Sequence, residues 1–284
     1  TGNWSGWSVF SGANSANSAP VRANQSSGSM YLRGEWNNWQ TNTMTKDSNN
    51  PEFHLVVPIA ANNNNWTFKL DPSGVWSGHN YGDSDATALT NGQVGAAVFD
   101  SAQGNLEANI GEAQSCWIVS VATSEGTASH TTSYALSRIT AMSLTGDGFS
   151  SPGISWSPTD TDNKMFVDPD YYWKWYKDVT LTAGTQIQFK FAPNSTWYDP
   201  MSKGWSFGDW DTTSGPDASL GTAYSGGSRG NLTYTPLRTG LYRSQLNLFT
   251  GVYSIIPADD VYIAAVPVQY PGRGESAAKL VTDV

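Results

Sequence analysis

The sequence predicts an all-β protein made of two similar modules, on the strength of three observations. Short runs of bulky apolar residues alternate with clusters of turn residues along most of the chain. No segment has the sustained 3.6-residue apolar spacing of an amphipathic helix, so we expect little helix. A motif occurs twice, with Phe-Lys, a tryptophan seven residues after the lysine, an aromatic-Gly-Asp triplet and then Gly-Asn-Leu. It contains Lys69 and Trp76 in its first copy, and Lys190 and Trp197 in its second.

The first copy is expected to consist of short strands between turns. Asn, Asp, Ser, Pro and Gly favour turns, and these residues cluster between the apolar runs. The expected strands are 30–33, 53–57 and 66–70, and the expected turns are 47–51, 62–65 and 71–74. Cys116, the only cysteine, lies in an apolar run that ends at Val119. This setting favours a buried strand residue over the alternative of a reactive thiol.

The second copy repeats this pattern with longer loops. Its expected strands are 139–144, 178–181, 186–191, 240–248 and 251–256, and the last two form a hairpin around 249–251. We place the added residues in loops, because an insertion within a strand would exchange its two faces. The chain then divides into an N-terminal Ser/Asn-rich arm, a first module, a second module, and a C-terminal strand and tail, at 1–28, 29–137, 138–258 and 259–284.

Composition argues against several classes of function. A net charge of −9 with 15 Lys and Arg argues against nucleic-acid binding, which needs clustered positive charge. No apolar run is long enough to suggest membrane insertion. The three histidines lie in no metal-binding or nucleophile motif, so we assign no catalytic residue and no metal ligand, and expect no enzyme activity.

The segment from Met30 to Trp39 carries a resemblance to a known family. A strand, Gly34 and an Asn-Asn-Trp turn, followed about thirty residues later by Phe-Lys at Lys69, resemble the starch-binding carbohydrate-binding modules. Tandem modules of this kind occur in bacterial amylopullulanases and in surface starch-binding lipoproteins of gut Bacteroidetes. The resemblance covers 30–125 and 139–257 and is closer in the first copy. It implies two tandem immunoglobulin-like β-sandwiches that bind an α-glucan.

Sugar chemistry suggests which residues would bind. A pyranose ring has a C–H face that packs on aromatic rings and a rim of hydroxyls that bond to charged or amide groups. The expected carbohydrate-binding residues are Trp39, Lys69, Trp76, Trp156, Lys190 and Trp197, with Trp36, Asn38 and Trp175 as supporting candidates. Each tryptophan could instead belong to a core, and each lysine could be a solvated strand residue. The partner would be a polysaccharide or oligosaccharide, bound outside the cell or at its surface, after removal of any signal peptide.

Two alternatives stay open. Calcium could bind in two Asp-rich loops, although ordinary turn aspartates explain them as well, and no other cofactor is expected. The aspartates concerned are Asp160, Asp162, Asp168, Asp170, Asp209, Asp211 and Asp217. The chain could also be a structural subunit of an extracellular layer or filament that self-assembles through the arm 1–28 and a strand at 261–266.

Overall fold

The structure is a computed structural model that describes residues 29–47, 50–60, 66–75, 80–83, 87–99, 104–110, 113–123, 131–210 and 215–258. Within these ranges the fold is all-β, as the sequence predicts, and the helical elements are two 3₁₀ turns, η1 (Glu35–Asn37) and η2 (Thr161–Asn163). None of the helices in this part of the chain could cross a membrane. The arm 1–28, the turn 62–65, Trp76 and the segment 259–284 with its strand 261–266 lie outside the described residues.

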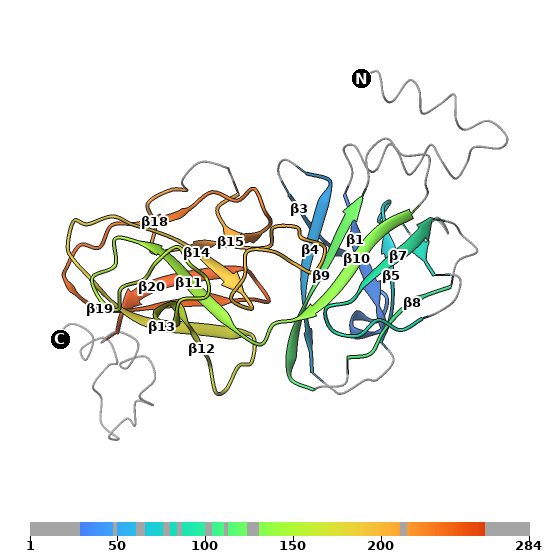
Figure 1. The fold of residues 1–284 in the computed structure, drawn as a ribbon, viewed down its shortest axis with the longest axis horizontal. Helices are drawn as coiled ribbons and strands as arrows, with labels where there is room; N and C mark the ends of the chain where they lie inside the picture. Colours follow the sequence, from blue (N-terminus) through green and yellow to red (C-terminus); the bar gives the residue numbers. More distant parts are fainter. Residues whose placement is uncertain are drawn as a thin grey trace, which may run out of the picture.

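The first half of the chain, up to Arg138, forms one continuous ten-stranded sheet that curls around a core (Figure 1). Its strands are β1 (Tyr31–Gly34), β2 (Asn42–Thr43), β3 (Thr45–Lys46), β4 (Glu52–Ile59), β5 (Trp66–Asp71), β6 (Tyr81–Gly82), β7 (Val94–Phe99), β8 (Leu106–Ala108), β9 (Ser115–Thr123) and β10 (Thr131–Arg138). Strands β6 and β7 separate β5 from β10 in the sheet, yet the rings of Phe68 and Tyr134 lie 5.8 Å apart. The sheet must therefore curl to bring those two strands face to face.

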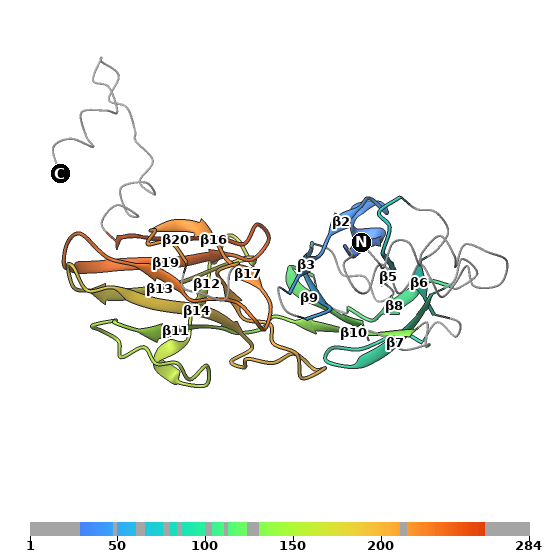
Figure 2. The same cartoon turned by 90° about the horizontal axis from the view of Figure 1, so that it is seen from above.

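The second half, from Met142, is a sandwich of two five-stranded sheets (Figure 2). One sheet contains β11 (Met142–Asp147), β14 (Ile187–Pro193), β15 (Phe207–Gly208), β17 (Tyr224–Ser225) and β18 (Leu232–Tyr234). The other contains β12 (Phe166–Val167), β13 (Lys174–Leu181), β16 (Leu220–Thr222), β19 (Gly240–Asn247) and β20 (Val252–Pro257). Their inner faces share one buried cluster, to which Phe189 and Leu246 belong. The predicted hairpin at 249–251 joins β19 to β20.

The repeated motif has the same strand partners in both halves. Phe68 pairs with Gly34 and Leu106, and Phe189 pairs with Gly146 and Leu232. The two aromatic-Gly-Asp triplets form β6 and β15 with their following bridges, from Asp83 to Gly104 and from Asp209 to Gly230. The shared motif thus corresponds to a shared arrangement of strands. The immunoglobulin-like character of the two modules and their boundary near 137 stay predictions.

Strands β4 and β9 lie at the junction between the halves and are covered on both faces. Their inward residues, among them Val57 and Val119, belong to the first-half core. Their alternate residues Cys116 and Ile118 belong to the second-half core, and Val56 packs against it. This double coverage explains why nearly every residue of β9 is buried.

The Cys116 thiol should be unreactive in the folded protein. The side chain is 2% exposed within β9, as the apolar sequence around it predicts, and burial raises its pKa to about 12. Because the thiolate is the reactive form, a disulfide reagent at pH 8 should leave native Cys116 unmodified and should modify it fully in denaturant. Reaction of the native protein at the rate of a free thiol would contradict this prediction.

His54 should make the protein less stable in acid. Its side chain is 1% exposed at the junction, neither ring nitrogen has a hydrogen-bond partner among the described residues, and burial lowers its pKa from 6.5 to about 4. The unfolded chain binds the proton more readily, so stability should be full above pH 6.5 and fall by about 3 kcal/mol as the pH drops to 4.

Urea unfolding of wild type and His54→Gln at pH 7 and pH 4.5 measures this effect. Burial raises the pKa of Glu52 and Asp199 nearby, which favours the folded state in acid and acts in the opposite direction. The difference between wild type and His54→Gln separates the histidine from these acids. An identical pH dependence in both proteins would rule out the role of His54.

Candidate functional site

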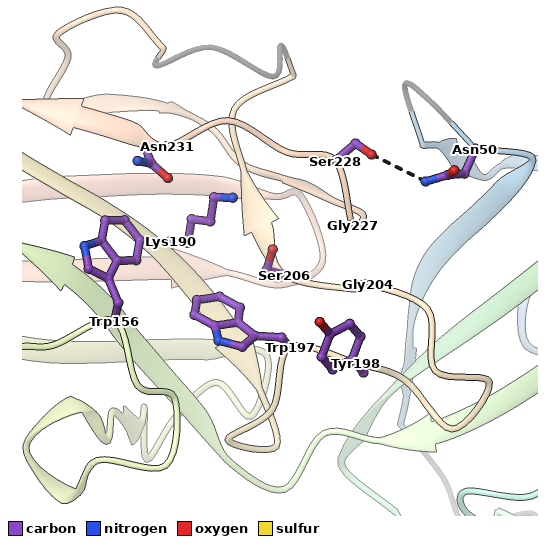
Figure 3. Close-up of a pocket in the computed structure, with 10 residues that line it drawn as sticks. All are labelled: Asn50, Trp156, Lys190, Trp197, Tyr198, Gly204, Ser206, Gly227, Ser228 and Asn231. Carbon is purple, nitrogen blue, oxygen red and sulfur yellow. Dashed lines mark hydrogen bonds between the residues drawn. The ribbon is translucent and has the colours of Figure 1, made fainter.

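An open pocket of about 480 Å³ lies in the second half, next to the first. One side carries four larger side chains, and the remainder is made of small and polar residues (Figure 3). The first group is Trp156, Lys190, Trp197 and Tyr198, and the second is Asn50, Gly204, Ser206, Gly227, Ser228 and Asn231. The fold therefore brings together all three carbohydrate-binding residues expected from the second copy of the motif.

Lys190 reaches the pocket because of the alternation of β14. The strand buries Ile187, Phe189 and Phe191 in the core and turns Lys190 to the opposite face, as the Phe-Lys motif predicts. The lysine Nζ donates to the backbone oxygen of Arg229. Burial lowers the pKa of Lys190. The ammonium group is therefore held in a partly dry position at the edge of the pocket, where a sugar hydroxyl could accept from it.

Trp197 and Tyr198 lie on a hairpin that follows β14. The chain reverses at Asn194 and Ser195, whose φ angles are 50° and 55°. Trp205, on the return limb, is 2% exposed, and its indole nitrogen donates to the oxygen of Thr196 at 3.0 Å. The buried Trp205 ring anchors the hairpin. On the limb that faces the pocket, Trp197 is half-buried and Tyr198 is 61% exposed.

Trp156 lies on the loop after β11. Buried Asn163 holds this loop, since its amide nitrogen donates to the oxygens of Ser155 and Ser157 at 2.7 Å each. The indole nitrogen of Trp156 donates to Asp147 Oδ2 at 3.2 Å. These bonds hold the backbone on either side of Trp156 and orient its indole. The half-buried ring is therefore preorganised as one wall of the pocket.

The small and polar side of the pocket is built by two segments in close contact. A Cβ atom at Gly204 would lie 2.2 Å from the Cα of Gly227, so the two backbones can meet only because residue 204 is glycine. Asn231 follows on the same segment and donates to Gln188 Oε1 at 2.9 Å. Amide and hydroxyl groups thus face the aromatic side (Figure 3).

The residues expected from the first copy lie elsewhere, at the end of β1 and on β5. Trp39 is half-buried, with a φ of 61°, and its oxygen accepts from Arg33 Nη1 at 3.1 Å. Lys69 is paired in register with Arg33, and burial lowers the pKa of Lys69. The Asn38 side chain is exposed. The ring of Trp36 packs 4.9 Å from that of Trp66, against the first-half core.

The prediction that Trp175 supports a binding site is wrong. Strand β13 alternates regularly, and Trp175 points the same way as Val179 and Leu181. All three side chains lie in the core between the two sheets, and Trp175 is 7% exposed. A ring in this position stabilises the sandwich and offers no face to a ligand.

Three of the aspartates considered for calcium accept backbone hydrogen bonds. Asp160 Oδ1 accepts from the backbone of Asp162, Asp168 Oδ1 from those of Asp170 and Tyr171, and Asp217 Oδ1 from that of Thr235. Within the described ranges, which exclude Asp211, no group of three or more His, Cys, Asp or Glu residues could hold a metal ion. Asp160 and Asp168 thus cap local turns, whereas Asp217 bonds to a residue 18 positions further along the chain.

The sequence-based prediction missed the polar half of the pocket. Asn231 belongs to the repeated Gly-Asn-Leu, so the repeat itself was a signal for it. Tyr198 directly follows Trp197 and could have been named with it. Ser206, Ser228 and Asn50 carry no comparable signal, because only the folded chain brings their segments together.

Comparison with known proteins yields matches among solved structures. No family model matches the chain, and no curated protein matches it. Among solved structures, the crystal structure of SusF from Bacteroides thetaiotaomicron aligns with a TM-score of 0.26 and 15% sequence identity. The alignment covers 82% of this chain and 48% of that chain, so the protein spans about half the length of its match. A match at this TM-score does not define a shared fold, and the function must be argued from the residues.

Proposed function

We propose that the protein is a non-catalytic carbohydrate-binding protein and that the second-half pocket is its binding site. The observation that carries this proposal is the gathering of Trp156, Lys190 and Trp197 around one open pocket. Two indole rings offer surfaces for sugar C–H groups, and the ammonium group offers a donor for a hydroxyl. Ser206 and Asn231 add polar groups on the facing side.

The chemistry of the lining supports binding rather than hydrolysis. Glycoside hydrolysis ordinarily requires two carboxyl groups on either side of the scissile bond. The residues that line the pocket in the described structure include no Asp or Glu and no His or Cys. A sugar held here would meet rings, an amine, amides and hydroxyls, none of which forms the usual acid and base pair.

We propose an α-glucan such as starch as the ligand, bound outside the cell or at its surface. The resemblance of the segment up to Trp39 to starch-binding modules supports this choice. The shape of the site agrees with it, because α-1,4-linked glucose chains coil and present a curved face, whereas β-1,4-linked chains are flat ribbons. A concave pocket with walls such as Trp156 suits the curved ligand better.

Affinity electrophoresis in gels with and without amylopectin tests the proposal. We expect slower migration in amylopectin, and heat release in calorimetric titrations with maltoheptaose and cyclodextrin. Cellohexaose and xylohexaose serve as controls for linkage and sugar, and should bind more weakly. Equal migration in both gels, together with no heat from any glucan, would refute the proposed function.

A further inference from the structure

The segment that carries Gly227 and Ser228 is held in place by the first half of the chain. The backbone nitrogen of Ser228 donates to Asp47 Oδ2 at 2.9 Å, and Asp47 is 1% exposed. Gly226 has a φ of 153°, and a Cβ there would lie 2.8 Å from Asp47 Oδ2. A glycine is therefore required where the first-half carboxylate approaches this wall of the pocket.

Arg229 makes a second connection from the same wall. Its Nη2 donates to the backbone oxygen of Lys46 at 2.6 Å, and its Nε donates to the oxygen of Ser225 at 3.0 Å. The guanidinium is 3% exposed and stacks over Trp210 at 4.7 Å. Lys190 donates to the backbone oxygen of the same arginine. Arg229 therefore contacts both the pocket lysine and the first-half residue Lys46.

The hairpin on the aromatic side is also attached to the first half. Lys203, on the turn that follows Tyr198, lies 3.3 Å from Glu52 Oε1 of β4. Both walls of the pocket thus contact the first half near Asn50, through Lys46 and Asp47 on one side and Glu52 on the other.

Asn50 places a first-half side chain in the pocket itself. Its amide nitrogen lies 3.4 Å from Ser228 Oγ and 3.3 Å from Asp47 Oδ1, and the residue is exposed. Figure 3 shows Trp156 and Asn50 at opposite ends of the pocket, with Trp197 and Tyr198 between them. A ligand stacked on the tryptophans would have to extend past Tyr198 to reach this amide.

Building on the proposed function, we propose that the binding site is composite, with Asn50 of the first half contacting the far end of a bound oligosaccharide. Asp47 and the Lys46 carbonyl act as positioning groups, since they hold the wall that carries Ser228. The site then takes an oligosaccharide that spans the pocket, and the shortest sugars bind without touching the first half.

Calorimetric titration of the full chain with maltotriose and maltoheptaose tests this inference. Asn50→Ala should weaken maltoheptaose binding about fivefold, the effect of one lost hydrogen bond, and leave maltotriose binding unchanged. Asn109→Ala is the matched control, because Asn109 is an exposed first-half asparagine that does not line the pocket. It should change neither affinity.

The possible results distinguish failure of the composite-site proposal from failure of the proposed glucan-binding function. Loss confined to the longer glucan supports Asn50 as a direct contact. Unchanged affinity for both sugars, or an equal loss for both, would overturn the composite site while glucan binding by the wild type stands. A wild-type chain that binds neither sugar would overturn both proposals. Unfolding curves of Asn50→Ala should match those of the wild type, because the side chain is exposed.

Discussion

Replacing Trp156 and Trp197 together by alanine is expected to abolish retention in amylopectin gels. The two indoles are the largest rings that line the pocket, beside the smaller ring of Tyr198. Truncation of a central aromatic at a binding site commonly costs about 2 kcal/mol or more, so the double variant should bind at least about a hundredfold more weakly. Both side chains are only half-buried, so the fold should survive, which unfolding in urea would verify.

Two further substitutions test whether loss of retention is specific to the pocket tryptophans. Phe166→Ala removes an aromatic that is 62% exposed on β12, in the other sheet of the sandwich, and should leave retention unchanged. Trp39→Ala tests the first copy of the motif. If Trp39→Ala abolishes retention and the double variant does not, the working site is in the first half and the pocket is not the glucan site.

Asp71→Ala is expected to destabilise the protein by about 3–5 kcal/mol, the usual cost of leaving a buried charge without its partner. Asp71 is 0% exposed, and its Oδ2 accepts from Arg33 Nε at 2.8 Å. Its Oδ1 accepts from Ser73 and Gly74. Burial alone would raise the pKa of Asp71, but the bonds from Ser73, Arg33 and Gly74 outweigh it and lower the pKa. The stability supplied by this carboxylate should therefore be lost as the pH falls.

The ion pair between Asp178 and Arg243 provides a matched comparison. It joins β13 to β19, with Arg243 Nε and Nη2 donating to the two Asp178 oxygens at 2.7 and 2.8 Å. Both side chains are more exposed than those of Arg33 and Asp71. Asp178→Ala should cost less, about 1 kcal/mol, because this pair is only partly buried and solvent screens it more. Urea unfolding of both variants measures the contrast. Equal losses of unfolding free energy in the two variants would show that burial does not determine the cost of breaking an ion pair.

The sequence predicted those parts of the site that depend on local pattern. Strand alternation placed Phe189 inward and Lys190 outward, and the repeat identified Trp197 by its distance from the lysine. The same rule would have excluded Trp175 if the expected strand 178–181 had begun at Lys174, because Val179 and Leu181 lie an even number of residues from Trp175. That prediction failed because the strand begins four residues earlier than the sequence analysis expected.

Other parts of the site depend on contacts between distant segments. The resemblance is closer in the first copy, yet among the described residues, which exclude Trp76, a pocket that gathers a tryptophan pair with a lysine is found in the second half. Asn50 and Ser228 meet because the second-half core packs against β4. Neither residue lies in a repeated motif, and no periodicity relates them. Such pairs follow from tertiary packing, which a single sequence does not encode in any local signal.

The double coverage of β4 and β9 limits how the protein can be divided. A fragment that begins at Met142 would expose to water the apolar surface that Val56, Cys116 and Ile118 cover, and it would lack Asn50. Such a fragment should be prone to self-association, whatever its affinity for sugar. The smallest portable unit for transfer to an enzyme or a surface is therefore both halves together. A fusion made at the apparent linker after Arg138 would discard part of the proposed binding site.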